Sequence, residues 1–216
     1  MGTISTWDHA EAQLKTALDA AGMAFTINEA DGAFYGPKID FDVTDALGRK
    51  WQCATIQLDY AQPENFDLKY TGADNTEHRP VVIHRAIFGS FERFIGILIE
   101  HYAGAFPLWL APVQAVVLPI SDRHLPYATA VRDELKAAGL RIELDERQEK
   151  IGYKIREAQL QKAPYMLVVG DRESADGTVS VRTRTGGDQG PSTVNEFVLK
   201  ARDEVAGKGA RPAAVS

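Results

Sequence analysis

The chain has little of three features that define whole classes of protein: cysteine, leader-like residues at its start, and long apolar runs. Cys53 is the one cysteine among 216 residues, which excludes an intramolecular disulfide and favours a compartment that keeps thiols reduced. Residues 1–7 show no basic or apolar region of a signal peptide, and the longest apolar run, residues 111–120, is interrupted by two prolines and a glutamine. We therefore expect a cytoplasmic protein with no signal peptide, no membrane span and no membrane partner.

The composition is that of an ordinary globular protein, with 44% hydrophobic and 25% charged residues, long enough for one large domain or two modest ones. The net charge of -6 is uneven. Residues 1–111 hold 8 Lys and Arg against 15 Asp and Glu, whereas residues 112–205 hold 14 against 15, and Lys208 and Arg211 follow. Any RNA contact is therefore expected in the second region, through local groups rather than a global field.

The first region combines helices with antiparallel strands. Apolar residues at helical spacing predict a helix from residue 7 that Gly22 ends, and residues 23–28 are typical of a short strand. Alternation over residues 38–43, a turn, and residues 50–58 predict a hairpin or meander. After a polar loop, a strand at residues 81–84 leads to a helix that starts near residue 91. This pattern indicates an α+β domain.

The second region, after two prolines between residues 107 and 112, alternates strands with helices. Strands are predicted at residues 113–118, 141–144, 165–169 and 179–183, and helices at 127–138, 150–161 and 194–205. The alternation indicates a small, mostly parallel α/β sheet. We therefore predict domains at residues 1–111 and 112–206, with a flexible tail at 207–216.

Two ordered groups of segments carry a family resemblance. The first group is FYGPKID at 34–40, WQCATIQLD at 51–59, HRA at 84–86 and GSFERF at 89–94; the second is DER at 145–147, KIGYKIR at 150–156 and PYMLVVGD at 164–171. Together they resemble the threonyl-tRNA synthetases, which are class II aminoacyl-tRNA synthetases. The first group is similar to the C-terminal half of the catalytic domain, residues 89–94 to the third class II motif, and the second group to the anticodon-binding domain.

Arg93 agrees with this resemblance on chemical grounds. Activation by ATP, which the family uses with Mg²⁺, expels pyrophosphate, and a fixed guanidinium can meet the charge that develops on the phosphates in fork geometry. A solvated helix arginine is the alternative. Gly89 and Ser90 would let adenine or ribose approach the backbone closely, although Ser90 could simply cap the helix.

The resemblance implies that polar residues of the first region lie beside the substrate. Tyr35 and Lys38 flank a rigid Gly-Pro turn, and Lys38 joins Arg93 as a catalytic candidate; the alternatives are an edge aromatic and a solvated strand charge. Gln52, Thr55 and Gln57 are similar to the family's substrate-side residues. Gln52 and Gln57 would face opposite sides of a regular strand, so either a bulge intervenes or only one of them lines the site.

His84 ends an apolar strand, where a satisfied core histidine is the ordinary interpretation. The resemblance implies instead that it is one of three protein ligands of a zinc ion that also takes the amino and hydroxyl groups of threonine. Such chelation can reject valine, which has no hydroxyl. The family's other two ligands lie outside the chain, and Cys53 is expected to be a small packed residue.

The anticodon-like region carries basic and polar candidates that a purely solvated helix would also explain. The resemblance implies contacts to a tRNA with a threonine anticodon from six side chains: Gln148, Lys150, Lys154, Arg156, Glu173 and Arg182. The lysines and Arg156 would hold phosphates beside Arg147, while Gln148, Glu173 and Arg182 read splayed bases. Many relatives have Asn where Gln148 stands.

These observations favour the C-terminal portion of a threonine-tRNA ligase. The first two class II motifs, the other zinc ligands and the editing region lie outside the chain, so we expect no threonyl-adenylate from these residues alone. The second hypothesis is a catalytically inactive tRNA-anticodon-binding module, and an unrelated α/β binding protein is the third. The complete family enzyme is expected to be a homodimer.

Overall fold

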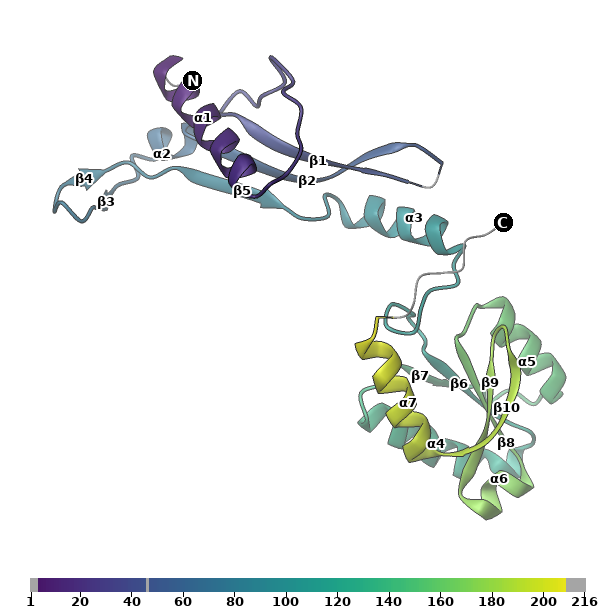
Figure 1. Ribbon diagram of the computed structural model, residues 1–216. Helices are drawn as coiled ribbons and strands as arrows, with labels where there is room; N and C mark the ends of the chain where they lie inside the picture. Colours follow the sequence, from purple (N-terminus) through teal and green to yellow (C-terminus); the bar gives the residue numbers. More distant parts are fainter. Residues whose placement is uncertain (1–3, 46, 209–216) are drawn as a thin grey trace. The chain divides into compact units, whose positions relative to one another are not determined.

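The computed structural model describes residues 4–45 and 47–208, which divide into two compact units between residues 97 and 98. The first unit is built on a three-stranded antiparallel sheet and the second on a five-stranded mixed sheet (Figure 1). The α+β and α/β fold classes are therefore confirmed. The predicted boundary between residues 111 and 112 stays a prediction, and residues 209–216 of the predicted tail lie outside the described residues.

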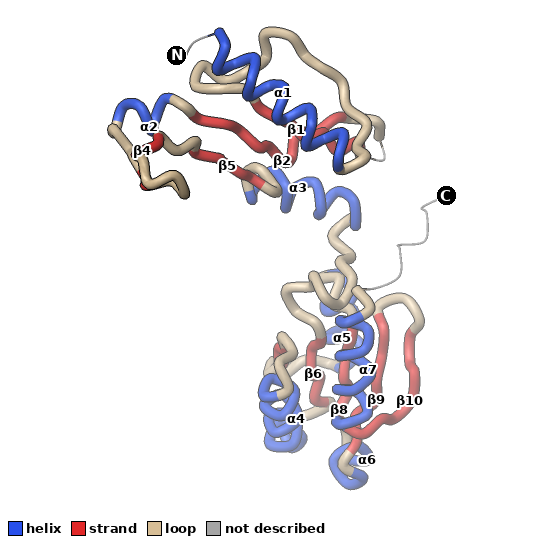
Figure 2. The backbone as a smooth tube through the Cα atoms, turned by 60° about the vertical axis from the view of Figure 1, so that its left-hand side comes forward, coloured by secondary structure: helices blue, strands red, loops and turns tan. Residues whose placement is uncertain are grey.

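The sheet of the first unit has the strand order β1-β2-β5. The predicted hairpin is confirmed as β1 (Lys38–Thr44) and β2 (Lys50–Asp59), and β5 (Val82–Ala86) pairs antiparallel with the other edge of β2. The helix α1 (Ile4–Ala20) crosses the strands on one face of the sheet (Figures 1 and 2), and α3 (Phe91–Tyr102) follows β5.

The strand predicted at residues 23–28 is wrong. This segment has no regular secondary structure, and none of the described strands pairs with it. Its apolar side chains Phe25 and Ile27 are exposed, because residues typical of a strand form one only where a neighbouring strand pairs with them. The polar loop that follows β2 instead contains a short helix α2 (Ala61–Asn65) and a small hairpin of β3 (Tyr70–Thr71) and β4 (Glu77–His78).

The second unit follows the predicted alternation of strands and helices. Its elements are β6 (Ala115–Pro119), the 3-10 helix η1 (Asp122–His124), α4 (Leu125–Ala137), β7 (Ile142–Leu144), α5 (Ile151–Leu160), β8 (Tyr165–Val169), α6 (Asp171–Asp176), β9 (Thr178–Thr183), β10 (Gly187–Thr193) and α7 (Val194–Ala206). The strand order is β10-β9-β8-β6-β7. Figure 2 labels β10, β9, β8 and β6 of this sheet.

This sheet is mixed rather than mostly parallel. The strands β7, β6 and β8 are parallel, whereas β9 and β10 are antiparallel to their neighbours. Sequence analysis missed β10 because its residues, GDQGPST, are those of a loop. The strand lies at the edge of the sheet, where Pro191 has no central ladder to interrupt.

The core of the second unit lies on both faces of the sheet. β6 and β8 are buried along their whole length, as expected for apolar parallel strands covered on two sides. Residues of α4 and α7, such as Leu135 and Phe197, pack on one face, and those of α5, such as Ala158, pack on the other. No helix among the residues described is long and apolar enough to cross a membrane.

Candidate functional site

The sheet of the first unit gathers the predicted substrate-side residues on one face. Opposed residues on neighbouring strands share a face. Gln57 of β2 lies opposite both Lys38 of β1 and His84 of β5, and Thr55 lies opposite Asp40. Four side chains predicted from distant segments therefore come together, with Asp40 added by its register.

A β-bulge brings Gln52 to the same face. Phe41 lies opposite Ala54 while the next residue, Asp42, lies opposite Gln52, so Cys53 is the extra residue on β2. An extra residue reverses the alternation of side chains beyond it. Of the two alternatives left open by the sequence, the bulge is the one that occurs. Cys53 itself is only 7% exposed, as expected for a packed residue.

Tyr35 is held over this face by the turn that precedes β1. A Cβ on Gly36 would lie 2.0 Å from the carbonyl oxygen of Leu58, so the backbone approaches β2 more closely than any side chain allows. The Tyr35 hydroxyl donates to Oε1 of Gln57. Its ring meets that of His84 edge to face at 6.0 Å between centroids, so the tyrosine, glutamine and histidine converge.

Asp59 is a site residue that sequence analysis missed. Its carboxylate is 2% exposed and interacts with Nε2 of His84 at 2.8 Å, while its other oxygen accepts from the amides of Ala61 and Gln62 at 2.8 and 3.0 Å. Burial raises the pKa of this carboxyl, but the hydrogen bonds outweigh burial and the net pKa is lowered. An aspartate two residues before a helix was the available signal.

Beside Asp59 lies a small pocket of about 240 Å³. Its lining joins the turn before β1, the end of β2, α2 and β5: Phe34, Tyr35, Asp59, Ala61, Gln62, Asn65 and His84. The pocket is large enough for a small polar group beside the imidazole.

The zinc ion that the resemblance implies does not fit the described residues alone. Among them no three His, Cys, Asp or Glu side chains converge. His84 offers one imidazole, and its Nε2 already interacts with Asp59. Three protein ligands are the usual minimum for catalytic zinc, so the described residues alone do not make a zinc site.

Lys38 and Asp40 form an ion pair on the polar face, 2.6 Å between Nζ and Oδ2. The hydrogen bond that the Lys38 ammonium donates to Asp40 raises the pKa of Lys38. Burial raises the pKa of Asp40, but the Lys38 ammonium reverses this and lowers it overall. The second Asp40 oxygen and the Thr55 hydroxyl are buried without a hydrogen-bond partner among the described residues. The face therefore retains unused polar atoms.

The start of α3 lies against the bulge. Gly89 has φ of 66°, and a Cβ there would lie 3.0 Å from the Cys53 carbonyl oxygen. Ser90 caps the helix, since its hydroxyl accepts from the Arg93 amide at 3.2 Å. Arg93 then donates to the Gln52 carbonyl at 3.3 Å. Gly89 and Arg93 thereby lie against β2, and Ser90 holds the first turn of α3.

In the second unit, two of the candidates lie beyond the carboxyl ends of the parallel strands. The chain reverses direction across the sheet between β6 and β8, which is where ligands bind in open α/β sheets. Gln148, after β7, donates to Asp122, after β6, at 2.7 Å. Glu173, after β8, accepts from the Gly170 amide at 2.9 Å. Two of the predicted base readers thus lie at this edge, Gln148 on a loop and Glu173 in the first turn of α6.

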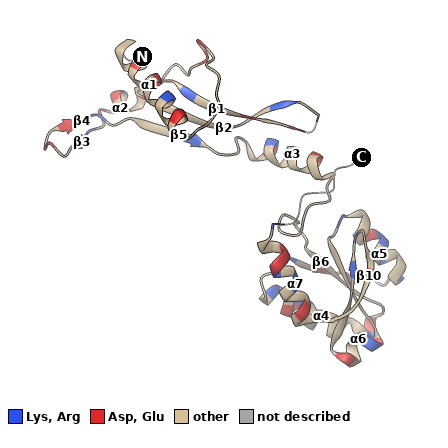
Figure 3. Ribbon diagram, in the orientation of Figure 1, with Lys and Arg blue, Asp and Glu red and all other residues tan. Residues whose placement is uncertain are grey.

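The other predicted readers and phosphate contacts are differently placed. Arg182 lies on β9 opposite Met166 and pairs with Asp188 at 3.2 Å, and its Nε is buried without a partner among the described residues. Lys150 is exposed directly before α5, and Arg156 is exposed on that helix. Charged residues of both signs are spread over the helices of this unit (Figure 3).

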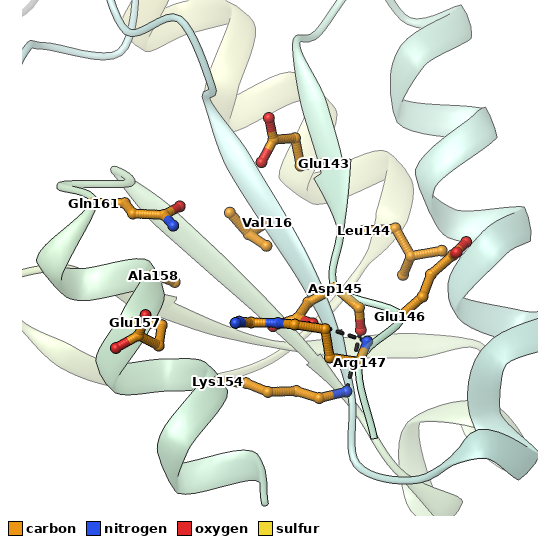
Figure 4. Close-up of a pocket in the computed structure, with 10 residues that line it drawn as sticks. All are labelled: Val116, Glu143, Leu144, Asp145, Glu146, Arg147, Lys154, Glu157, Ala158 and Gln161. Atoms are coloured by element: carbon orange, nitrogen blue, oxygen red, sulfur yellow. Dashed lines mark hydrogen bonds and ion pairs between the residues drawn. The ribbon is translucent and has the colours of Figure 1, made fainter. Parts of the chain in front are cut away.

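Lys154 does not lie on the surface with Lys150 and Arg156, and the expectation that it reaches a phosphate is wrong. Its side chain is 3% exposed. Its ammonium donates to the carbonyl oxygen of Pro119 at 3.2 Å and to that of Asp145 at 3.1 Å. Figure 4 shows Lys154 beside Asp145. Helical spacing could not separate these lysines, because burial depends on the strands beneath the helix.

Lys154 lines an open pocket of about 500 Å³ between α5 and β7. Glu143 of β7 and Glu157 of α5 face this pocket from its two sides, with Val116 at its floor (Figure 4). Arg147 holds the Asp145 carboxylate with two hydrogen bonds of 2.9 and 2.7 Å. That guanidinium lowers the pKa of Asp145.

A buried histidine at the switch point was also missed. His124 is 4% exposed, with Nδ1 at 3.1 Å from the Ser121 hydroxyl and Nε2 at 3.0 Å from Asp171. Asp171 also pairs with Arg123. The cluster connects the loop after β6 to the start of α6, which carries Glu173.

The two units match two families of known domains. Residues 5–102 match the tRNA synthetase class II core domain (G, H, P, S and T). Residues 114–204 match the anticodon binding domain.

Similar proteins cover nearly the whole chain. A threonine--tRNA ligase from Symbiobacterium thermophilum is 62% identical over 208 residues, 96% of this chain and 32% of that protein, and one from Desulforamulus reducens is 58% identical over 96% and 33%. The chain thus spans about a third of the length of these curated relatives. A crystal structure of the RNA binding domain of threonyl-tRNA synthetase from Cryptosporidium parvum has a TM-score of 0.86 at 42% identity, covering 100% of this chain and 54% of that one.

Proposed function

We propose that the chain, whose relatives are threonine--tRNA ligases, forms part of a class II aminoacyl-tRNA synthetase that attaches threonine to its tRNA at the expense of ATP. The observation that carries the proposal is the polar face of the first sheet, where Tyr35, Gln57 and His84 converge, together with Arg93, which is held against Gln52 of the same strand β2. Threonine, ATP, Mg²⁺ and zinc are the ligands proposed for the complete enzyme.

On this proposal the residues of the first unit divide the work. Arg93, held by the Gln52 carbonyl, meets the negative charge that develops as pyrophosphate leaves. Gly89 and Ser90 leave the backbone open to adenosine. Lys38, Gln52 and Thr55 line the polar face of the first sheet, on which the amino acid and the α-phosphate would meet.

The second unit is proposed to read the anticodon of the tRNA. Gln148, Glu173 and Arg182 supply donors and acceptors for splayed bases, and Lys150 and Arg156 hold phosphates. Cytoplasmic location and a homodimeric complete enzyme belong to the same proposal.

A tRNA-anticodon-binding module without catalysis remains the second candidate. One observation favours it: both buried core clusters described lie in the second unit, so the tRNA-binding half carries its own core. Such a module would retain the first unit for structural reasons alone.

A chimera separates the two candidates. The missing length is supplied by the preceding residues of the Symbiobacterium thermophilum ligase, and threonine-dependent exchange of pyrophosphate with ATP is measured. We expect exchange by the chimera, a loss of roughly 100-fold or more with Arg93→Ala, and background exchange by the 216-residue chain alone. Arg172→Ala, on the exposed face of α6, is the matched control and should leave exchange unchanged.

Exchange that survives Arg93→Ala, or a folded chimera with no exchange, contradicts the ligase proposal. The anticodon role is tested separately by anisotropy with tRNAs that differ only in the anticodon. Arg182→Ala should cost about 1–3 kcal/mol for the threonine anticodon alone. Equal losses for both tRNAs would leave only nonspecific electrostatics.

A further inference from the structure

Lys154 is a buried lysine whose charge the proposed function does not use. Lysine is almost never fully buried without partners, because its ammonium loses its hydration. Here the partners are two backbone carbonyls, those of Pro119 and Asp145, and no carboxylate lies within ion-pair distance of it among the described residues. The position of those carbonyls is therefore what the ammonium stabilises.

Both carbonyls stand where a parallel strand ends. Pro119 is the last residue of β6, and Asp145 directly follows β7, which pairs with β6. The ammonium, which α5 carries, thus joins two neighbouring strand ends. Beyond these ends begin two loops, residues 120–124 and residues 145–150.

The same two loops are joined a second time at their outer ends. Gln148 of the second loop donates to the Asp122 carboxylate of the first at 2.7 Å. The Lys154 contacts to the strand ends are buried, whereas the Gln148–Asp122 hydrogen bond is exposed. The position of the Gln148 side chain therefore depends on the position of the loop ends, which Lys154 holds.

We propose that Lys154 is a positioning residue that clamps the ends of β6 and β7, and so sets how well the loop carrying Gln148 discriminates between anticodons. The inference rests on the proposed anticodon reading and deepens it. Lys154 acts through Gln148 and touches no RNA. The groups around the ammonium fit this role, because the Asp145 carboxylate is bound by Arg147 and the Asp145 backbone carbonyl accepts from Lys154.

The salt dependence of tRNA binding distinguishes a clamp from a phosphate contact. A lysine that contacts a phosphate releases counterions on binding, so its loss lowers the slope of log affinity against log salt by about 1. A buried clamp leaves that slope unchanged. The 216-residue chain is titrated at several salt concentrations with two tRNAs that differ only in the anticodon.

For Lys154→Met, which keeps the aliphatic stem and removes the donors, we expect an unchanged slope. The affinity ratio between matched and swapped anticodons should fall by at least about fivefold, the lower end for one lost base contact. The matched control is Lys150→Met, an exposed lysine four residues away, which should lower the slope and leave the ratio unchanged. Lys154→Arg keeps the charge and donors and should restore part of the ratio.

A lowered slope with an unchanged ratio for Lys154→Met would overturn the proposal, and so would no change in either quantity. If Lys154→Met fails to fold, Asp122→Ala is the second variant, because it removes the hydrogen bond to Gln148 and leaves the core intact. It must lower the affinity ratio between the two anticodons and leave the salt slope unchanged.

Amide hydrogen exchange keeps the clamp testable if the wild-type chain does not discriminate between the tRNAs, which would contradict the anticodon role itself. The amides of Ile120 and Asp145 bond across the strand ends to Val169 and Val117 at 2.9 and 3.0 Å. Lys154→Met should speed their exchange and Lys150→Met should not. Unchanged exchange in Lys154→Met would refute the clamp independently of RNA.

Discussion

At the scale of single residues, Gly36 shows how one missing side chain places another. The chain passes so close to β2 here that a Cβ would lie 2.0 Å from the Leu58 carbonyl oxygen and 2.9 Å from its carbon. Flanking bonds from the Leu58 amide to Pro37 and from the Tyr60 amide to Tyr35, 3.0 and 3.2 Å, hold the same segment. The close approach brings the Tyr35 hydroxyl to Gln57.

We predict that Gly36→Ala lowers the stability of the first unit. The added methyl group must push residues 35–37 away from β2 and break the flanking hydrogen bonds, each worth about 1 kcal/mol. Urea unfolding followed by circular dichroism measures the loss. Gly96→Ala is the control: that glycine lies inside α3 with no atom within 4 Å of its Cβ position, so it should be neutral or stabilising. Equal behaviour of the two variants would contradict the prediction.

At the scale of elements, the β1–β2 hairpin is closed by one carboxylate. Asp45 accepts from the amides of Leu47 and Arg49, both at 2.9 Å, from Arg49 Nε at 2.6 Å and from Trp51 Nε1 at 2.9 Å. The hydrogen bond from Trp51 and those from Arg49 and Leu47 hold the pKa of Asp45 well below its ordinary value. The turn was predicted from its residues, whereas this convergence on Asp45 was not.

The hairpin should therefore weaken in acid. A carboxyl whose pKa is lower in the folded than in the unfolded state stabilises the fold above the unfolded pKa, near 4, and loses that stabilisation as pH falls through the folded pKa. We expect the Leu47 and Arg49 amides to lose protection against hydrogen exchange, corrected for intrinsic rate, as the pH is lowered below about 4.

Asp45→Asn should remove most of this acid dependence and lower protection already at pH 7. Asp42→Asn, at an exposed position of β1, serves as the control for losing one carboxylate from the same hairpin. If the acid response persists in Asp45→Asn but disappears in Asp42→Asn, the response comes from Asp42, and the prediction is contradicted.

At the scale of the whole molecule, the two units differ in how much apolar surface they bury. The buried apolar residues described in the first unit are few and mostly small: Ala10, Pro37, Cys53, Leu58, Ala61 and Pro63. None of the α3 residues is buried, and Phe91 is 72% exposed. In the second unit, two core clusters enclose β6 and β8 from both sides.

We predict that the first unit unfolds at a lower denaturant concentration than the second. Apolar burial contributes roughly 25 cal/mol per Å², so the unit with the smaller core has less to offset its chain entropy. Native-state hydrogen exchange in increasing guanidinium should show amides of β1 and β2 losing protection before those of β6 and β8. Simultaneous loss in all four strands would mean that the units unfold together.

The sequence by itself determined the order and type of most elements, the two fold classes and the resemblance to a family. Apolar periodicity and runs such as YMLVV in β8 are local properties, and an element that buries one stripe or both faces must carry them in its own residues. The ordered motifs at 34–40, 84–94 and 150–171 carry the resemblance for a related reason, since each segment is informative without its neighbours.

Only the tertiary structure decided which residues share a site and which are buried. The bulge at Cys53, the carboxylate of Asp59 against His84, and the burial of Lys154 rather than Lys150 all depend on groups supplied by other elements. The wrong prediction of a strand at residues 23–28 and the failure to predict β10 have the same physical reason. Register, burial and pairing are set by what lies opposite a residue in space, and the sequence around that residue does not contain this information.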